Sequence, residues 1–119
     1  MKKLTKKEDQ IMQVVWRLQS AFIRDIIAEL PGDPHYNTVA TIVKILVKKG
    51  FLTSKLLGNT HQYSPAVPFE AYRDQDLGDI KKKYFSNSLP KMLAHFARSE
   101  DLSEEEIDDL IDLIKKNKE

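Results

Sequence analysis

The sequence contains no cysteine, which excludes disulfides, thiolate metal sites and thiol catalysis and fits a reducing compartment. Long hydrophobic runs are also missing, since no window approaches the roughly 18 apolar residues that a membrane-spanning helix needs. The start of the chain, MKKLTKKEDQ, is charged and has no apolar signal core. We therefore expect a cytoplasmic protein that is not inserted into a membrane.

Recognisable catalytic or metal-binding patterns are absent as well. His35, His61 and His95 are too scattered for metal ligands, and there is neither a glycine-rich phosphate loop nor a Ser/His/Asp set in a strand-turn context. The acidic run at 104–109 is better explained as a helix cap followed by a solvated face than as a cation site. We expect no enzyme, no cofactor and no bound metal.

The charge that is present is distributed unevenly. Residues 1–83 hold 14 Lys and Arg against 9 Asp and Glu, whereas residues 84–119 hold 5 against 9. No Asp or Glu occurs from Pro34 to Phe69. Charge runs are often only solvated surface, but a negatively charged partner would meet no local repulsion in this stretch.

The first 30 residues predict two helices separated by a short strand. Thr5 and Glu8 are spaced as a capping box, in which each side chain accepts a hydrogen bond from the backbone N–H of the other residue. Apolar residues then recur at helical spacing as far as 17–19. Residues 21–23 indicate a very short strand, and a two-turn helix is predicted from Arg24 onward.

The stretch NTVATIVKILVKKG, residues 37–50, predicts a third helix. Asn37 is a good N-cap, and Gly50 stands where helices commonly end in a left-handed residue. One face is apolar and is expected in the core: Val39, Ile42, Val43 and Leu46. The opposite face carries threonines and an isoleucine among its lysines, which is unusual for a surface that only has to be soluble.

Two strand-like runs follow this helix. Residues 51–55 and 60–63 flank Leu56-Leu57-Gly58-Asn59, whose Gly-Asn pair predicts a hairpin turn. Helix, short strand, helix, turn, helix and hairpin in this order make a winged helix-turn-helix, which commonly places its recognition helix in the DNA major groove. Winged helices also serve as protein-docking modules, so the fold alone does not decide the function.

The rest of the chain predicts short helices, at about 68–83, from Ser88-Leu89-Pro90 and from the capping box at 103–106. Such helices cannot bury their apolar faces on the small winged module, so pairing with a second copy of the chain is expected. The predicted class is mainly α with a small β-hairpin. We expect a winged helix DNA-binding domain at 1–66 and a helical dimerisation domain at 67–119.

The outward face of the third helix and the hairpin supply candidate DNA contacts. Amides and hydroxyls can read base edges, methyl groups can contact thymine, and lysines can meet phosphates or guanine. The candidates are Asn37, Thr38, Thr41, Lys44, Ile45 and Lys48 on the helix and Lys55, Asn59 and His61 on the hairpin. Plainer roles stay open: Thr38 as neutral surface, Ile45 as a packing residue and His61 as an exposed strand residue.

Four motifs together resemble the penicillinase repressor family, which includes the β-lactamase, methicillin-resistance and copper-transport repressors of bacteria. The motifs are ExxIMxxxW from Glu8 to Trp16, NTVxTxxxxLxxKG from Asn37 to Gly50, HxYxP from His61 to Pro65, and LSxEE from Leu102 onward. The resemblance covers nearly the entire chain and implies a homodimeric winged-helix repressor of inverted-repeat operators. It also implies that Thr38, Thr41, Lys44 and Lys48 approach DNA.

The sequence departs from this family in three places. Many members have arginine where Ile45 stands, so the operator sequence cannot be carried over. Copper-responsive members bind metal through C-terminal cysteines, and their absence argues against copper sensing. In antibiotic-responsive members a membrane sensor leads to cleavage of an Asn-Phe bond, but at the similar position here His95 replaces the asparagine before Phe96. Cleavage at His95-Phe96 would imply a sensor-linked protease as a partner. The alternative is an ordinary core helix with Phe96 buried.

Two functions of different classes follow from the sequence. The leading one is a homodimeric repressor of an inverted-repeat operator in double-stranded DNA, with residues 37–49 in the major groove and the hairpin at 51–63 on the backbone. The alternative is a winged-helix docking module whose lysine-rich surface binds an acidic protein.

Overall fold

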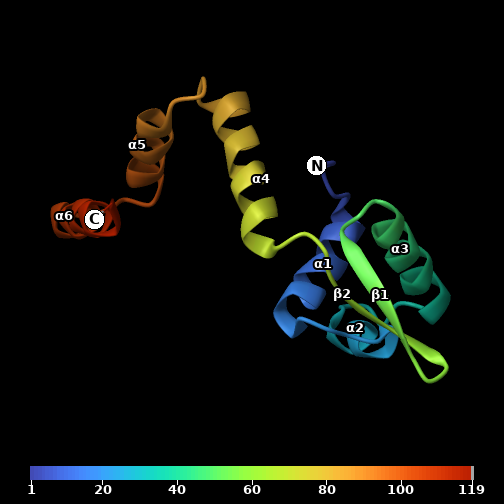
Figure 1. Ribbon diagram of the computed structural model, residues 1–119. Coiled ribbons are helices and arrows are strands. Elements are labelled where there is room, and N and C mark those ends of the chain that lie inside the picture. The colour runs from blue at the N-terminus through green and yellow to red at the C-terminus, as the bar shows by residue number, and fades with distance from the viewer. Residues whose placement is uncertain (119) are drawn as a thin grey trace. The chain divides into compact units, whose positions relative to one another are not determined.

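The computed structural model describes residues 1–118, and the predicted class, helices with one β-hairpin, is confirmed. In chain order the elements are α1 (Lys6–Leu18), α2 (Ile23–Glu29), α3 (Tyr36–Lys48), β1 (Leu52–Leu57), β2 (Thr60–Pro65), α4 (Phe69–Tyr84), α5 (Leu89–Ser99) and α6 (Glu104–Lys118) (Figure 1). The chain forms two compact units, Met1–Asp76 and the part from Leu77 onward. The functional boundary expected between residues 66 and 67 stays a prediction.

Helix α1 begins at the predicted capping box. The Thr5 hydroxyl accepts the Glu8 N–H at 3.2 Å, and the Glu8 carboxylate accepts the Thr5 N–H at 2.9 Å. Two of the amides that a helix start leaves unpaired are thereby satisfied. The helix ends at Leu18, within the predicted limits, and Gln19 follows with a φ of 70°.

The segment between α1 and α2 pairs with the hairpin at a single position. Ala21 and Tyr63 exchange two backbone hydrogen bonds, at 2.9 and 2.8 Å. The predicted strand is reduced to this isolated bridge, because α2 begins at Ile23 rather than at Arg24. The Asp25 carboxylate accepts the N–H of the residue before the helix at 2.9 Å, which favours the earlier start.

Helix α3 also begins earlier than the sequence predicts. Tyr36 is its first residue and His35 its N-cap, because the first helical hydrogen bond runs from the Val39 N–H to the His35 carbonyl at 3.2 Å. Asn37 is therefore not the N-cap but a residue of the first turn. At the other end Gly50 has a φ of 85°, which confirms its predicted left-handed role.

The hairpin is longer than predicted. Strand β1 continues to Leu57 and β2 to Pro65, so only Gly58 and Asn59 form the turn. Gly58 has a φ of 62°, the left-handed conformation that such a two-residue hairpin turn requires. Figure 1 shows this turn at the far end of the hairpin, away from the helices.

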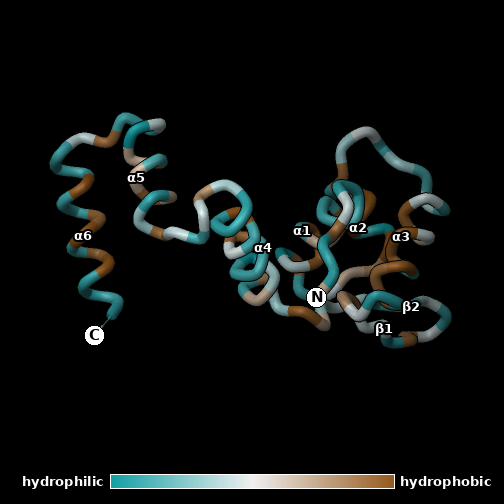
Figure 2. Tube along the Cα trace, turned by 90° about the horizontal axis from the view of Figure 1, so that it is seen from above, coloured by the Kyte–Doolittle hydropathy of each residue, from teal (hydrophilic) through white to brown (hydrophobic). Residues whose placement is uncertain are grey.

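The first unit encloses one hydrophobic core, to which its helices, its hairpin and the start of α4 contribute. The largest fully buried side chains are Ile11, Met12, Val15, Ile26, Val39, Val43, Leu46 and Phe51. Of the α3 residues expected in the core, only Ile42 is half-buried. Figure 2 shows how hydrophobic residues recur along α3. Burial of this face fixes the opposite face of α3 toward solvent.

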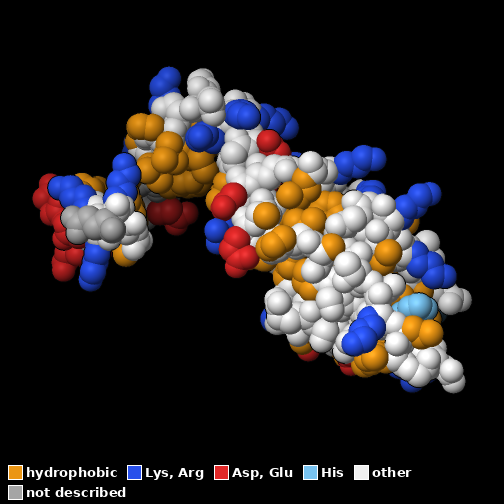
Figure 3. Space-filling view, viewed as in Figure 1, with side chains coloured by type: hydrophobic (Ala, Val, Ile, Leu, Met, Phe, Trp, Pro, Cys, Tyr) orange, Lys and Arg blue, Asp and Glu red, His pale blue; other side chains and the backbone are white. Residues whose placement is uncertain are grey.

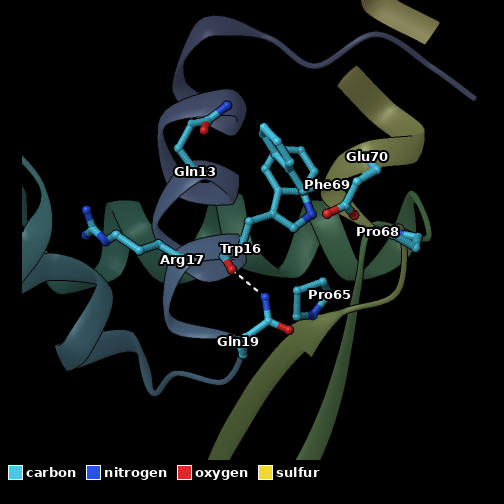
Figure 4. Close-up of a pocket in the computed structure, with 8 residues that line it drawn as sticks. All are labelled: Gln13, Trp16, Arg17, Gln19, Pro65, Pro68, Phe69 and Glu70. Atoms are coloured by element: carbon cyan, nitrogen blue, oxygen red, sulfur yellow. Dashed lines mark hydrogen bonds between the residues drawn. The ribbon is translucent and has the colours of Figure 1, made fainter. Parts of the chain in front are cut away.

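The first turns of α4 pack on the winged unit. Tyr72 is buried, and its hydroxyl accepts the Leu4 N–H at 2.8 Å. The Phe69 ring meets the Trp16 ring edge-on, with centroids 5.5 Å apart. Figure 4 shows both rings in the groove lined by Gln13, Trp16, Arg17, Gln19, Pro65, Pro68, Phe69 and Glu70. The Gln75 amide donates to the Met1 carbonyl at 2.8 Å, so the contacts of this unit extend almost to its limit at residue 76.

The second unit contains little core of its own. Its predicted caps are confirmed: the Ser88 hydroxyl accepts the Lys91 N–H at 3.3 Å, and Ser103 and Glu106 form a reciprocal capping box at 3.1 and 3.2 Å. Met92 is the only buried residue among residues 77–118. The exposed large apolar side chains are Leu77, Tyr84, Leu89, Leu93, Phe96, Ile111, Leu113 and Ile114. Figure 2 shows that hydrophobic residues recur along α6. Because Ile111 and Ile114 are exposed at helical spacing, this helix has an uncovered apolar face.

Candidate nucleic-acid interface

Helix α3 presents an exposed face along its length. The exposed candidates on it are Asn37, Thr38, Thr41, Lys44, Ile45 and Lys48. The opposite face is buried, since Val39, Val43 and Leu46 are at most 2% exposed. Ile45 is 42% exposed, so it is not a residue of the core. A straight, uncovered helix face of this kind has the size and shape that a major groove accepts.

The hydroxyl of Thr41 is already engaged within the helix. It donates to the Asn37 carbonyl at 2.8 Å, the usual back-bond of a threonine inside a helix. What Thr41 can still offer a partner is its methyl group and the acceptor lone pairs of its oxygen. Apolar contact with a thymine methyl therefore suits Thr41 better than donation to a base edge.

Three of the four lysines in this region have no ionic partner. Lys44, Lys48 and Lys55 are exposed, and none of them forms an ion pair within residues 1–118. Lys49 differs, because its ammonium lies 2.8 Å from the Glu8 carboxylate, whose side chain is only 5% exposed. Burial acts to raise the pKa of Glu8, but hydrogen bonds with Lys49 and the Thr5 backbone outweigh it and lower the pKa. Lys49 therefore joins the end of α3 to α1 and is not a free cation for a partner.

The hairpin divides its candidate residues between two faces. Lys55 pairs with Gln62 and His61 pairs with Leu56. Because successive strand residues point to opposite faces, Lys55 and His61 lie on different sides of the hairpin. Asn59 lies in the turn, and all three candidates are exposed. The structure therefore does not gather them on one surface.

The face of the hairpin that carries His61 borders α3. Ser54, His61 and Tyr63 line a hollow together with Lys44 and Val47, which we call the α3–hairpin hollow. Figure 3 shows a histidine on the surface of this unit with Lys and Arg side chains around it. Sequence reasoning missed Ser54, because a strand serine carries no signal until the strand register places it beside a histidine and a lysine.

Tyr63 forms the inner wall of this hollow. It is 6% exposed, and its ring centroid lies 6.3 Å from that of His61. Burial raises the pKa of Tyr63 above its ordinary value of 10.0, and the nearby Tyr36 adds to this effect. The Tyr63 hydroxyl is consequently neutral at physiological pH and adds no negative charge to the hollow.

The candidate cleavage position lies in α5. His95 and Phe96 are both exposed, and Phe96 is 43% exposed. In the single chain Phe96 is thus not the buried core residue of the alternative interpretation. Both rings lie near Phe85, with centroids 5.4 and 6.3 Å from it.

The described part of the chain offers neither a metal site nor a membrane span. No cluster of three or more His, Asp or Glu side chains in residues 1–118 is arranged to bind a metal ion. None of the helices in this range combines the length and apolarity that crossing a membrane requires.

The chain is similar to known proteins over nearly its whole length. The family model described as penicillinase repressor matches residues 4–116. The penicillinase repressor of Bacillus licheniformis is 26% identical over 123 residues, which cover 99% of this chain and 96% of that protein. The methicillin resistance regulatory protein MecI of Staphylococcus aureus (strain N315) is 24% identical over 115 residues, covering 95% and 94%. Because the family model spans nearly all of the sequence, the chain belongs to the penicillinase repressor family.

Proposed function

We propose that the chain is a homodimeric transcriptional repressor that binds an inverted-repeat operator in double-stranded DNA. Helix α3 enters the major groove and the hairpin lies on the adjoining backbone. The observation that carries this proposal is the uncovered face of α3, from Asn37 to Lys48, within a stretch that has no acidic residue. The names of the relatives, a penicillinase repressor and a methicillin resistance regulatory protein, support the same class.

The groups on α3 suit the two tasks of a DNA-reading helix. Asn37 and Thr38 lie in the first turn, where unpaired backbone amides and the helix dipole favour a phosphate. Thr41 and Ile45 offer apolar surface to thymine methyl groups, and Lys48 offers an ammonium to the backbone. Specificity then comes from the middle of the helix and affinity from its lysines.

The dimer is proposed from the second unit. Large apolar side chains on α5 and α6 are exposed where a solvated surface would carry polar ones, and only Met92 is buried among residues 77–118. A second copy of the chain could cover both faces through a two-fold axis. Because each copy presents one α3, the same symmetry accounts for an operator with two inverted half-sites.

Release of the operator is proposed to follow cleavage at His95–Phe96 by a sensor-linked protease. The support is the position of this bond in an exposed part of the second unit, where cleavage would split α5 and remove part of the dimer surface. Immunoblots of cells exposed to a β-lactam test this step. An intact chain in cells whose target gene has been induced would exclude it.

The proposed function is tested by selecting bound duplexes from a random pool with the purified full-length chain. We expect enrichment of an inverted repeat whose half-sites are one or two helical turns apart. Enrichment of single half-sites would contradict a dimeric reader. Failure to retain any duplex at low salt would contradict DNA binding and favour the docking of an acidic protein on the lysine-rich face.

A further inference from the structure

The α3–hairpin hollow brings together three kinds of group that bind anions. Its lining includes Lys44 from α3, His61 from β2 and Ser54 from β1. These side chains carry an ammonium, an imidazole and a hydroxyl. Val47 and Tyr63 provide the rest of the lining. A phosphate accepts hydrogen bonds through several oxygens at once, so a lysine, a histidine and a serine around one hollow match its chemistry.

The arrangement follows from the register of the hairpin. Ser54 pairs with Tyr63 and Leu56 with His61, so alternate residues of both strands share the face that borders α3. The Phe51 N–H donates to the Leu46 carbonyl at 2.9 Å, which ties the start of β1 to the end of α3. The two elements that border the hollow are therefore also joined by a backbone hydrogen bond.

The charges around the hollow all favour an anion. Its lining contains no carboxylate, and no Asp or Glu occurs between residues 34 and 69. His61 faces Lys44 from α3 and the neutral Tyr63 from its own strand, while β1 contributes no charged side chain, since Lys55 lies on the other face of the hairpin.

We propose that the α3–hairpin hollow binds one phosphate of the DNA backbone, shared between the recognition helix and the wing, and that Ser54 is one of its ligands. This inference rests on the proposed DNA-binding function and goes further by naming a single shared phosphate. A phosphate held by both elements fixes the position of α3 in the groove relative to the backbone. Lys44, Ser54 and His61 then act as one unit, so the effects of removing them are not additive.

The test uses the duplex recovered by selection, in which single phosphates are replaced one at a time by neutral methylphosphonates. We expect one position in each half-site to weaken binding of the wild-type chain by about tenfold, the order expected for a lost charge-assisted contact. Ser54→Ala should weaken binding to the unmodified duplex by about threefold or more. On the duplex modified at that position, Ser54→Ala and Lys44→Gln should each change affinity by less than about twofold, because their partner is already neutral.

Thr53→Ala is the matched control, since Thr53 is an exposed neighbour on the other face of the same strand. It should leave affinity for the unmodified duplex within about twofold, because it removes no ligand of the shared phosphate. Thermal unfolding of each variant confirms that the hairpin is intact.

His61→Gln gives a second readout. It removes another ligand of the shared phosphate and should weaken binding to the unmodified duplex. On the duplex with the methylphosphonate at the shared position it should change affinity by less than about twofold, as for the other two ligands.

The outcomes separate this inference from the function on which it rests. If the chain binds no duplex, the proposed function fails. If it binds the selected duplex but Ser54→Ala and Lys44→Gln weaken modified and unmodified duplexes equally, DNA binding stands and the shared phosphate is wrong. If Ser54→Ala weakens binding of an acidic protein but leaves DNA binding unchanged, the hollow binds carboxylates instead.

Discussion

An ion pair between Lys49 and Glu8 connects the end of α3 to the start of α1. Its ammonium lies 2.8 and 3.0 Å from the two oxygens of the Glu8 carboxylate, which also caps α1 through the Thr5 N–H. One buried carboxylate thus fixes two helices at once. Together with the burial of Val39, Val43 and Leu46, this contact holds α3 with its opposite face toward solvent.

Loss of the Glu8 charge should destabilise the first unit. Glu8→Gln keeps an oxygen for the Thr5 N–H but leaves Lys49 without its ionic partner, and we expect a cost of about 1–3 kcal/mol. Urea unfolding measures it. Arg17→Gln is the control, because the Arg17–Glu29 pair is exposed at 58% and 47% and should cost less than about 0.5 kcal/mol. Equal losses in both variants would contradict the special role of Glu8.

The same pair predicts a pH dependence. The pKa of Glu8 is lowered from its ordinary value of 4.5, so the folded chain holds its charged form more strongly than the unfolded chain does. The stabilisation is complete above about pH 4.5 and is lost as pH falls through the lower folded-state value. The stability gap between wild type and Glu8→Gln should therefore be full at neutral pH and shrink on acidification. A gap that is constant down to the acid transition would count against this pair.

Thr41 should contact DNA through its methyl group, because its hydroxyl donates to the Asn37 carbonyl. Thr41→Val should keep the preference for the selected duplex, whereas Thr41→Ala should reduce it, by about 1 kcal/mol per half-site. Duplexes in which one thymine at a time is replaced by uracil, which lacks the methyl, provide the measurement. At one position in each half-site the wild-type chain should lose affinity and Thr41→Ala should not. Base reading by Thr41 would be wrong if Thr41→Ala weakened selected and random duplexes alike.

The lysines should separate into DNA contacts and a structural residue. Lys48→Gln and Lys55→Gln should weaken binding on all sequences, and each should reduce the slope of log affinity against log salt by about one. Lys49→Gln is the matched neighbour, and it should lower stability while leaving the slope unchanged, since Lys49 is paired with Glu8. A smaller salt slope for Lys49→Gln than for the wild-type chain would show that the Lys49–Glu8 ion pair breaks when the chain binds DNA.

Dimerisation should depend on the apolar face of α5. Leu93 is 38% exposed on the same side of the helix as Leu89 and Phe96. Leu93→Glu should shift the chain to monomers in sedimentation velocity and weaken operator binding. Ala94→Glu adds the same charge on another side of the helix and should leave the dimer intact. Unchanged dimers in both variants would place the interface elsewhere.

Much of the local structure could be predicted because its causes are local. The caps at Thr5, Ser88 and Ser103 depend on residues three positions apart, and α3 ends at the left-handed Gly50. The helical spacing of the apolar residues likewise predicts which face of α3 is buried.

The features that sequence reasoning missed depend on distant partners. Whether Ser54 shares a surface with Lys44 follows from the hairpin register and from the packing of β1 on α3, and neither is readable from a serine in a strand. The early start of α3 was missed for a different reason, because the backbone of His35 caps the helix without any help from its side chain. The hydrogen bond between Leu4 and Tyr72 joins residues 68 positions apart, and no pattern in the sequence predicts it.

Trp16 is the single tryptophan of the chain, and it lies where α4 leaves the winged unit. Its indole N–H donates to the Val67 carbonyl at 2.9 Å, and its ring contacts those of Phe69 and Tyr72. Its fluorescence therefore comes from one defined place. The emission maximum reports whether the first turns of α4 stay docked, so detachment of this helix during operator release or proteolysis can be followed optically in the unlabelled protein.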